Sequence, residues 1–456
     1  MTAAKRPVHR ILVANRGEIA LRVIRACHEL DIEAIQVYSE ADRDSLPVRL
    51  ADGSICIGPP PSSQSYLKID LLIAAAQAAK ADAIHPGYGF LSENAAFAQA
   101  CEQAGLAFIG PPARAIAVMG DKASARRMAA EAGVPITPGS PGTVANARAA
   151  RELADSLGYP VLLKAAAGGG GRGMRIVRDP AGLDTRFGDA AREAQAAFGD
   201  GSLYVEKFLE RVRHVEIQVL ADGETVLHLG ERDCSIQRRN QKLVEESPSP
   251  VLGDALRAQM GEAAVRVCRR VGYRSAGTIE FIVDAGSGVF YFMEMNTRVQ
   301  VEHPVTEVVT GIDIVKSQIR IAEGAGLDIA QDDVRLIGHA LECRINAEDP
   351  ALDFAPSPGE VRELHLPGGP GIRLDSHVHA GYRIPPYYDS LLAKVIAWGR
   401  DRHEAIMRMR RALSEMRLEG IATTLPFHLR LLADERFRRG DVHTRFIEDE
   451  FGNGSL

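Results

Sequence analysis

The chain has 456 residues, of which 25% are charged, 46% are hydrophobic and 5% are aromatic. This length corresponds to about three domains of ordinary size. Collagen, coiled coil and general disorder are excluded, because 43 Gly and 24 Pro are scattered among regular apolar segments and no heptad repeat is sustained. The formal net charge of −6 and a pI near 6.1 argue against nucleic acid or an anionic membrane as the main partner. We therefore expect a globular protein with small-molecule ligands.

The sequence also predicts where the protein works. Residues 1–7 are charged and lack the apolar stretch of a secretory signal. The longest apolar run, residues 71–79, is shorter than the roughly 20 residues that cross a membrane. The six cysteines lie far apart without a C-x-x-C pair, so we expect no structural zinc site. These features predict a cytoplasmic protein with reduced thiols.

The first part of the chain alternates between strand-like and helix-like segments. An apolar β-type run at 10–15 precedes amphipathic helical spacing over 19–30 and a second strand at 34–38. Helix-like stretches at 69–79 and 95–104 each lead into a further strand. This alternation predicts a parallel α/β sheet over residues 1–115. The sheet is Rossmann-like in pattern only, since its first turn has a single glycine and lacks the dinucleotide fingerprint.

The remaining chain divides at changes of pattern. Residues 116–132 read as one helix, and the Gly- and Pro-rich stretch 133–142 is the clearest linker. From His214 onward, short alternating strands with hairpin turns predict a different sheet. We expect an N-terminal domain over 1–115, a helical linker over 116–135, a small α+β lid domain over 136–208, and a larger α+β domain over 209–456, closed by helices at 401–413 and at the end.

A glycine-rich segment, GGGGRG at 168–173, formally satisfies G-x-G-x-x-G. The dinucleotide fingerprint needs a helix after the glycines, whereas residues 174–178 are strand-like. The Walker A spacing is also absent. A glycine-rich hairpin between two strands can close over a triphosphate with its bare backbone N–H groups, and Lys164 at its base can reach phosphate oxygens. The alternative is a flexible hairpin with a surface lysine.

Two glutamates face each other on a second hairpin, whose turn is predicted at 286–288. With this turn Ala285 pairs with Val289, and the same register puts Glu280 directly opposite Glu294. Like charges in such positions are destabilising. The conflict disappears if a hard divalent cation lies between them, and magnesium beside a triphosphate is the economical choice. Two solvated surface glutamates are the alternative.

The alternation of the second hairpin strand continues beyond Glu294. Asn296, two residues further, can supply another oxygen to a metal. Arg298, Gln300 and Glu302 would share the same face, which places a cation, an amide and a potential base near the metal. A salt-bridged sheet face is the alternative.

Longer motifs resemble those of one family. They are NRGEIA at 15–20, HPGYGFLSEN at 85–94, MGDK at 119–122, the glycine-rich segment, RHVEIQ at 213–218, ERDCS at 231–235, and EMNTR through EHP at 294–304. In this order, over about residues 8–450, they resemble biotin carboxylase of the ATP-grasp superfamily.

The resemblance implies a reaction and a set of ligands. ATP would activate bicarbonate to carboxyphosphate, which carboxylates N1 of biotin on a carrier protein. Glu280, Glu294 and Asn296 would bind magnesium or manganese. The residues implied to hold ATP are Lys122, Lys164, Gly170, Gly171, Glu206, Lys207, Phe208, Leu209, His214 and Asn240.

The resemblance also assigns the reacting groups. Lys242, Arg298, Gln300 and the backbone of Val301 would hold bicarbonate, with Glu302 as the base that deprotonates it. Arg344 would stabilise the biotin enolate oxyanion. One position departs from the family, which often has histidine where this chain has Asn240. Asparagine keeps a donor and an acceptor, so ATP binding should survive, but no imidazole role is implied.

The resemblance finally implies partners. The chain has no Met-Lys-Met biotinylation site, so we expect a separate subunit, usually a homodimer, that meets a biotin carboxyl carrier protein and carboxyltransferase subunits in trans. Acetyl-CoA carboxylase is the most frequent parent enzyme. A propionyl-CoA, pyruvate or urea-type carboxylase, a catalytically silent ATP-binding regulator, and an ATP-grasp amide ligase are the alternatives.

Overall fold

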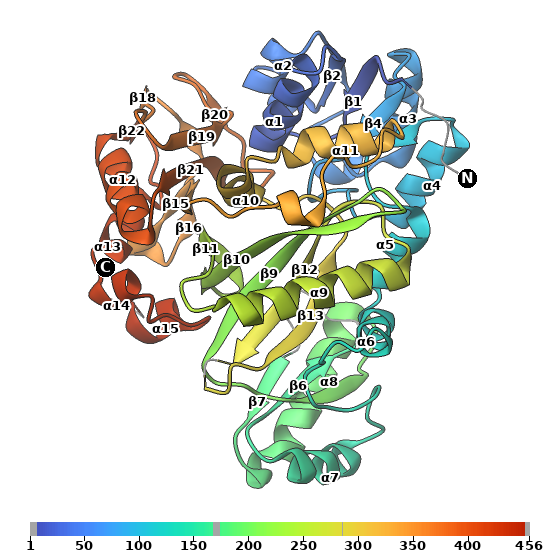
Figure 1. Ribbon diagram of the computed structural model, residues 1–456, viewed down its shortest axis with the longest axis vertical. Helices are drawn as coiled ribbons and strands as arrows, with labels where there is room; N and C mark the ends of the chain where they lie inside the picture. Colours follow the sequence, from blue (N-terminus) through green and yellow to red (C-terminus); the bar gives the residue numbers. More distant parts are fainter. Residues whose placement is uncertain (1–6, 167–173, 285, 452–456) are drawn as a thin grey trace.

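A computed structural model describes residues 7–166, 174–284 and 286–451. Figure 1 shows the N-terminal part in blue at the top, a small helix-flanked sheet at the bottom, and the last helices in red at the left. A large sheet joins these parts in the middle of the molecule. Within the described residues, no helix is both long enough and apolar enough to span a bilayer.

The N-terminal part is a five-stranded parallel sheet with strand order β3-β2-β1-β4-β5. Its elements are β1 Arg10–Val13, α1 Gly17–His28, β2 Glu33–Tyr38, α2 Leu46–Leu50, β3 Gly53–Cys56, α3 Ile69–Ala78, β4 Ala83–His85, α4 Ala95–Gln103 and β5 Ala107–Phe108. The expected parallel α/β sheet is therefore confirmed. Strand β3 escaped prediction because it is a short edge strand whose residues alternate between half-buried and exposed.

The connection that follows is two helices, α5 Ala113–Gly120 and α6 Lys122–Glu131. The prediction of one continuous helix over 116–132 is wrong. Asp121 adopts an extended conformation, and its side chain accepts a hydrogen bond from the Ser124 N–H at 2.8 Å. An aspartate that caps a new helix in this way ends the preceding one.

The small sheet is antiparallel with order β7-β6-β8. Its elements are α7 Ala147–Leu157, β6 Val161–Ala165, β7 Met174–Val177, α8 Leu183–Phe198 and β8 Leu203–Lys207. Strands β6 and β7 pair as a hairpin around the glycine-rich segment, as expected. The segment itself, including Gly170 and Gly171, lies outside the described residues.

The large sheet has eight strands in the order β13-β12-β9-β10-β11-β14-β21-β19, and every pair in it is antiparallel. Its strands and helices are β9 Val212–Ala221, β10 Val226–Arg238, β11 Gln241–Ser247, α9 Asp254–Val271, β12 Ser275–Asp284, β13 Phe290–Asn296, α10 His303–Thr310, α11 Ile314–Ala322, β14 His339–Asn346, β19 Ile372–Ser376, β21 Leu391–Gly399 and α12 Arg402–Glu415. A second sheet is therefore confirmed, but the expected short strands are wrong here, since β10 spans 13 residues.

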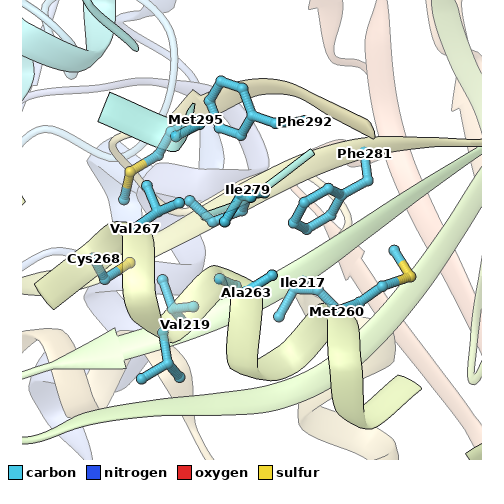
Figure 2. Packing of buried hydrophobic residues seen from close by; sticks show 14 of the residues in the cluster. Ile217, Val219, Met260, Ala263, Val267, Cys268, Ile279, Phe281, Phe292 and Met295 are labelled. Atoms are coloured by element: carbon cyan, nitrogen blue, oxygen red, sulfur yellow. The ribbon is translucent and has the colours of Figure 1, made fainter. Parts of the chain in front are cut away.

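Helices cover both faces of this sheet, which explains its long buried strands. On one face, Met260, Ala263 and Val267 of α9 repeat at helical spacing and pack against Ile217 and Phe281 (Figure 2). On the other face, α11 packs against β12 and β9. Each fully buried aliphatic or aromatic side chain stabilises the fold by about 1.5–3 kcal/mol.

Short strands and helices complete the C-terminal part. They are β15 Glu348–Asp349, β16 Ala355–Pro356, β17 Gly359–Glu360, β18 Glu363–His365, β20 Arg383–Ile384, β22 Arg417–Glu419, α13 Leu425–Leu431, α14 Glu435–Arg439 and α15 Phe446–Glu450. The helices expected near 401–413 and at the end are confirmed. The proposed division of the chain at residues 115, 135 and 208 stays a prediction.

Candidate active site

A cleft of about 960 Å³ lies where the N-terminal part, the small sheet and the large sheet meet. Most of the predicted site residues line it, although they come from segments far apart in the sequence. These are Lys122, Lys164, Glu206, His214, Asn240, Lys242, Glu280, Glu294, Asn296, Arg298, Gln300, Val301, Glu302 and Arg344.

Three predicted nucleotide residues do not line this cleft. Lys207, the last residue of β8, points its ammonium at the carbonyl oxygens of Gly158 and Tyr159, at 2.9 and 3.2 Å. Phe208 and Leu209 line a separate, more open hollow of about 410 Å³. Gly170 and Gly171 lie outside the described residues, so their assignment stays a prediction.

Asn240 lies in the tight turn between β10 and β11. Arg239 and Asn240 have φ values of +48° and +64°, the left-handed conformation that a two-residue hairpin requires at both central positions. Asparagine tolerates this conformation better than most residues. The departure from histidine therefore suits the turn, and Asn240 still lines the cleft.

The two facing glutamates occupy the predicted positions, but the register that leads to them is not constant. Glu280 pairs with Glu294, whereas Phe281 pairs with Phe292 and the register shifts by one residue between the two pairs. The predicted partner of Val289, Ala285, lies outside the described residues. An extra residue in β13 thus returns the glutamates to opposite positions, and such irregularities commonly re-aim side chains beside active sites.

Glu280 does not need a metal ion to be neutralised. His214 Nε2 lies 2.9 Å and Lys242 Nζ 3.0 Å from its carboxylate, and Asn296 Nδ2 donates to it at 2.8 Å. Burial would raise the pKa of Glu280, but Lys242 and His214 outweigh it and hold the pKa well below its usual range. Part of the expected repulsion is therefore relieved by neighbouring cations of the protein itself, and the assignment of a metal ion to this pair stays a prediction.

Glu294 is the carboxylate whose charge is less well compensated. Burial and the repulsion from Glu280 raise its pKa, against the pull of Lys122. A divalent cation beside Glu294 would relieve this repulsion, and carboxylate and amide oxygens are the ligands that magnesium prefers. The donor set of Glu280, Glu294 and Asn296 therefore fits the predicted metal.

Among the described side chains, two other groups are close enough to share an ion. They are His214, Glu216 and Glu280, and Glu216, Cys234 and Glu302. Both groups need Glu216, whose oxygens already accept from Arg232 Nε at 2.5 Å and from Lys242 Nζ at 2.6 Å. Glu280, Glu294 and Asn296 therefore remain the predicted metal ligands.

Lys242 lies at the centre of the acidic groups. Its ammonium is 2.6 Å from Glu216, 3.0 Å from Glu280 and 2.6 Å from Glu302. Burial would lower the pKa of Lys242, but the three carboxylates raise it well above its ordinary value. Lys242 is therefore a permanent cation in the cleft.

Glu302, the predicted base, immediately precedes α10 and is held between two cations. Lys242 is 2.6 Å from one oxygen and the Arg344 guanidinium is 3.0 Å from the other. Burial would raise the pKa of Glu302, but Lys242 and Arg344 keep it well below the usual range. Glu302 is thus ionised, and its pKa would rise if either cation turned to another anion.

Two residues beyond the predicted set orient Arg298 and Gln300. Glu93 accepts from Arg298 Nε at 2.7 Å, and Arg232, whose side chain is fully buried, donates to Gln300 Oε1 at 2.7 Å. The Gln300 amide in turn donates to Glu280 at 2.8 Å. Both missed residues lie in motifs that sequence analysis singled out, at 85–94 and 231–235, but no spacing rule connects them to their partners.

Arg344 is oriented by strand β14. The apolar side chains Cys343 and Ile345 join the core cluster that includes α12 residues, so the alternating Arg344 points to the opposite face, into the cleft. Its Nε donates to Glu245 at 2.6 Å. Burial raises the pKa of Glu245 to about 7, with repulsion from Glu302 opposed by Arg344.

Three protein-family domains match consecutive segments of the chain. The biotin carboxylase N-terminal domain matches residues 7–116, the ATP-binding domain of the carbamoyl-phosphate synthase L chain matches 121–330, and the biotin carboxylase C-terminal domain matches 342–449. The ATP-binding match in the middle, with the sheets described above, defines an ATP-grasp enzyme.

Similar proteins cover almost the whole chain. A biotin carboxylase of Nostoc sp. is 57% identical over 441 residues, which is 96% of this chain and 98% of the relative. A pyruvate carboxylase subunit of Methanothermobacter thermautotrophicus is 53% identical over 446 residues, 98% of this chain and 90% of the relative. The chain belongs to the biotin carboxylase family.

Solved structures share the fold. The biotin carboxylase–beta-gamma-ATP complex of Campylobacter jejuni superposes with a TM-score of 0.93 at 48% identity, covering 97% of this chain and 99% of the other. The biotin carboxylase domain dimer of Hydrogenobacter thermophilus 2-oxoglutarate carboxylase, in complex with MgADP, ADP and bicarbonate, has a TM-score of 0.92 at 49% identity, covering 97% and 98%.

Proposed function

We propose that this protein is an ATP-dependent biotin carboxylase that transfers the carboxyl group of bicarbonate, through carboxyphosphate, to biotin on a carrier protein. One observation carries the proposal beyond family membership. Glu302 lies between Lys242 at 2.6 Å and Arg344 at 3.0 Å, so the three residues to which we assign the base, the bicarbonate-binding cation and the oxyanion-stabilising cation meet at one point of the cleft.

We assign the nucleotide to the side of the cleft formed by the small sheet. Lys164 of β6 forms an ion pair with Glu206 of β8, and Lys122, the first residue of α6, lines the same cleft. These lysines would neutralise phosphate oxygens. Glu280, Glu294 and Asn296 would hold magnesium or manganese, which supplies further charge neutralisation on the phosphates.

We assign bicarbonate to the segment that runs into α10. Lys242, Arg298 and the N-terminus of this helix place positive charge where the anion would bind. As bicarbonate attracts Lys242, the pKa of Glu302 rises, and the Glu302 carboxylate takes the bicarbonate proton. Glu93 keeps the Arg298 guanidinium oriented during this step.

We assign biotin to the side of the cleft near Arg344. When the biotin N1 proton is lost, negative charge develops on the ureido oxygen, and the guanidinium stabilises it without reorganisation because Glu245 already fixes its orientation. The low-dielectric surroundings strengthen this interaction.

We propose that the protein works as a homodimer in the cytoplasm, with a biotin carboxyl carrier protein and carboxyltransferase subunits. The dimer in the Hydrogenobacter thermophilus structure supports the first point, and six free cysteines, five of them buried, support a reducing compartment. Two plant relatives are named chloroplastic.

For the parent enzyme we propose acetyl-CoA carboxylase, with a carboxylase of another acceptor as the second candidate. The relatives named biotin carboxylase support the first candidate, and the similarity to a 2-oxoglutarate carboxylase domain and to a pyruvate carboxylase subunit is the reason for the second. Co-purification of the native protein with its carboxyltransferase subunit, followed by acyl-CoA and keto-acid assays, decides between them.

The proposed activity is tested by ATP hydrolysis with free biotin. We expect hydrolysis that requires bicarbonate and rises with biotin. A silent regulator would bind ATP without bicarbonate-dependent turnover, and an amide ligase would need an amine in place of biotin.

A further inference from the structure

A lysine outside the predicted site is buried directly behind it. Lys394 of β21 pairs in register with Arg344 of β14 on one side and with Asp375 of β19 on the other. Its side chain is 0% exposed. Lysine is almost never fully buried without partners, because removing its charge from water is costly. The contacts of this ammonium should therefore show what it does.

The shortest contact of Lys394 is with the backbone of the catalytic segment. Its Nζ donates to the Val301 carbonyl oxygen at 2.7 Å. The Val301 carbonyl and the Glu302 N–H belong to one planar peptide group, so a fixed carbonyl fixes the plane from which the Glu302 side chain departs. Val301 and Glu302 connect the cleft lining to α10, which begins at His303.

The charge of Lys394 is balanced by the N-terminal part. Glu18, in the first turn of α1, has one oxygen 3.1 Å from the ammonium, and the same oxygen accepts from the Tyr88 hydroxyl. The other oxygen, Oε2, is buried and makes no hydrogen bond within the described residues. Asp375 is more distant, at 3.9 Å, and is already held by Arg373. Glu18 is therefore the main counter-charge.

We propose that Lys394 is a positioning residue for carboxylation, which holds the Val301–Glu302 peptide so that the base meets bicarbonate in the required orientation. This inference rests on the proposed function. Lys394 does not line the cleft and acts through the Val301 carbonyl. A lysine that only stabilises the fold would contribute through its ion pair with Glu18 and not through this carbonyl.

A double substitution separates the two roles. Lys394→Met alone would leave Glu18 as a buried carboxylate without its cation, which is destabilising whatever the role of Lys394. Lys394→Met with Glu18→Gln removes both charges. Lys394→Gln with Glu18→Gln is the matched partner, since Gln can still donate a hydrogen bond to Val301 and Met cannot. Lys316→Met is the control, because Lys316 also forms an ion pair near α1, with Glu29, which directly follows the helix.

We expect Lys394→Met/Glu18→Gln to melt within a few degrees of wild type, but to lose about ten-fold or more in kcat/KM for bicarbonate. KM for ATP should stay within about two-fold of wild type, because the nucleotide side is untouched. Lys394→Gln/Glu18→Gln should recover at least about half of the loss in kcat/KM for bicarbonate, measured on a logarithmic scale. Lys316→Met should resemble wild type.

Equal kcat/KM for bicarbonate in the Met and Gln double variants, or values near wild type in both, would overturn the inference. Failure of both double variants to fold would also overturn it, since Lys394 would then be a requirement of the fold. Wild-type protein is assayed first. Absence of bicarbonate-dependent ATP hydrolysis there would remove the proposed function, and this inference with it, whereas loss in the variants alone concerns Lys394.

Discussion

Lys242 and Glu302 lie with Nζ 2.6 Å from Oε1, so the proposed base is paired with a cation before any substrate arrives. Arg344 holds the other oxygen of the same carboxylate at 3.0 Å. A base with such a low pKa accepts a proton poorly. Both cations are also the groups to which the substrates would bind, so binding of bicarbonate and biotin can release Glu302 for proton transfer. Activation of the base is thereby coupled to occupancy of the site.

Replacement of Glu302 by Gln tests the base directly. The amide fills the same space but cannot take a proton, so bicarbonate-dependent ATP hydrolysis should fall by about 10²- to 10⁴-fold. ATP affinity, measured by titration calorimetry, should not change, because the nucleotide contacts come from other strands. Glu102→Gln, in an exposed residue of α4, is the control. Near-normal turnover of Glu302→Gln would remove this residue from the role.

Arg344 should act on biotin and not on bicarbonate. Arg344→Ala should lose carboxybiotin formation while keeping much of the slow hydrolysis of ATP that depends on bicarbonate alone. Arg344→Lys should not restore transfer, since an ammonium lacks the planar fork that Glu245 and Glu302 hold. Comparison of the two rates in each variant gives the result. An equal loss of both rates would assign Arg344 to the first step or to the fold.

Sequence reasoning reached the facing glutamates because a short hairpin turn and strand alternation are local rules. It missed the register shift after Glu280, where β13 carries one extra residue opposite β12. The break at Asp121 was also missed, because the apolar spacing of α5 and α6 is continuous while the capping hydrogen bond interrupts the helix.

The residues that orient the site were beyond sequence reasoning. Glu93 contacts Arg298, and Lys394 contacts Val301, across 205 and 93 residues of chain. Such contacts depend on how the N-terminal part and the sheets dock together, which no local periodicity encodes. The parallel sheet, by contrast, was predictable because its three longer helices and most of its strands carry their own apolar pattern, whereas the five-residue α2 Leu46–Leu50 was missed.

The two glutamates that we propose as metal ligands should respond differently to substitution. Glu280→Gln should destabilise the metal-free protein by about 3–5 kcal/mol, because Lys242 and His214 would lose a buried partner. Glu294→Gln should leave its stability unchanged or raise it by up to about 1 kcal/mol, because cross-strand repulsion is relieved.

Thermal melts with and without magnesium–ATP complete this comparison. Wild type should gain stability as RT ln(1 + [L]/Kd), and Glu294→Gln should gain less because its Kd is raised. Should Glu294→Gln be much less stable without metal and yet gain as much as wild type, Glu294 would be structural and not a metal ligand.

Glu246, which does not line the cleft, should make the stability of the protein depend on pH. It pairs with Arg402 at 2.6 Å and with His339 at 2.8 Å. Burial would raise the pKa of Glu246, but Arg402 and His339 lower it from 4.5 to about 2. Because the folded-state pKa is depressed, the stabilisation is present above pH 4.5 and is lost as the pH falls towards 2.

We expect Glu246→Gln to be less stable than wild type by about 3 kcal/mol at pH 7, with the difference shrinking at pH 3. Urea unfolding at the two pH values measures it. A difference in unfolding free energy that stays constant between pH 7 and pH 3 would show that Glu246 is not ionised through its pairing with Arg402.

Transfer of labelled carbon is the most direct test that the cleft carboxylates biotin. Purified protein is incubated with ATP, magnesium, free biotin and isotopically labelled bicarbonate, and carboxybiotin is trapped at alkaline pH. We expect label in carboxybiotin that requires ATP, with one ADP released for each carboxyl group transferred after subtraction of the biotin-independent hydrolysis. ATP binding without any label in biotin, or label that appears without ATP, would contradict the assignment.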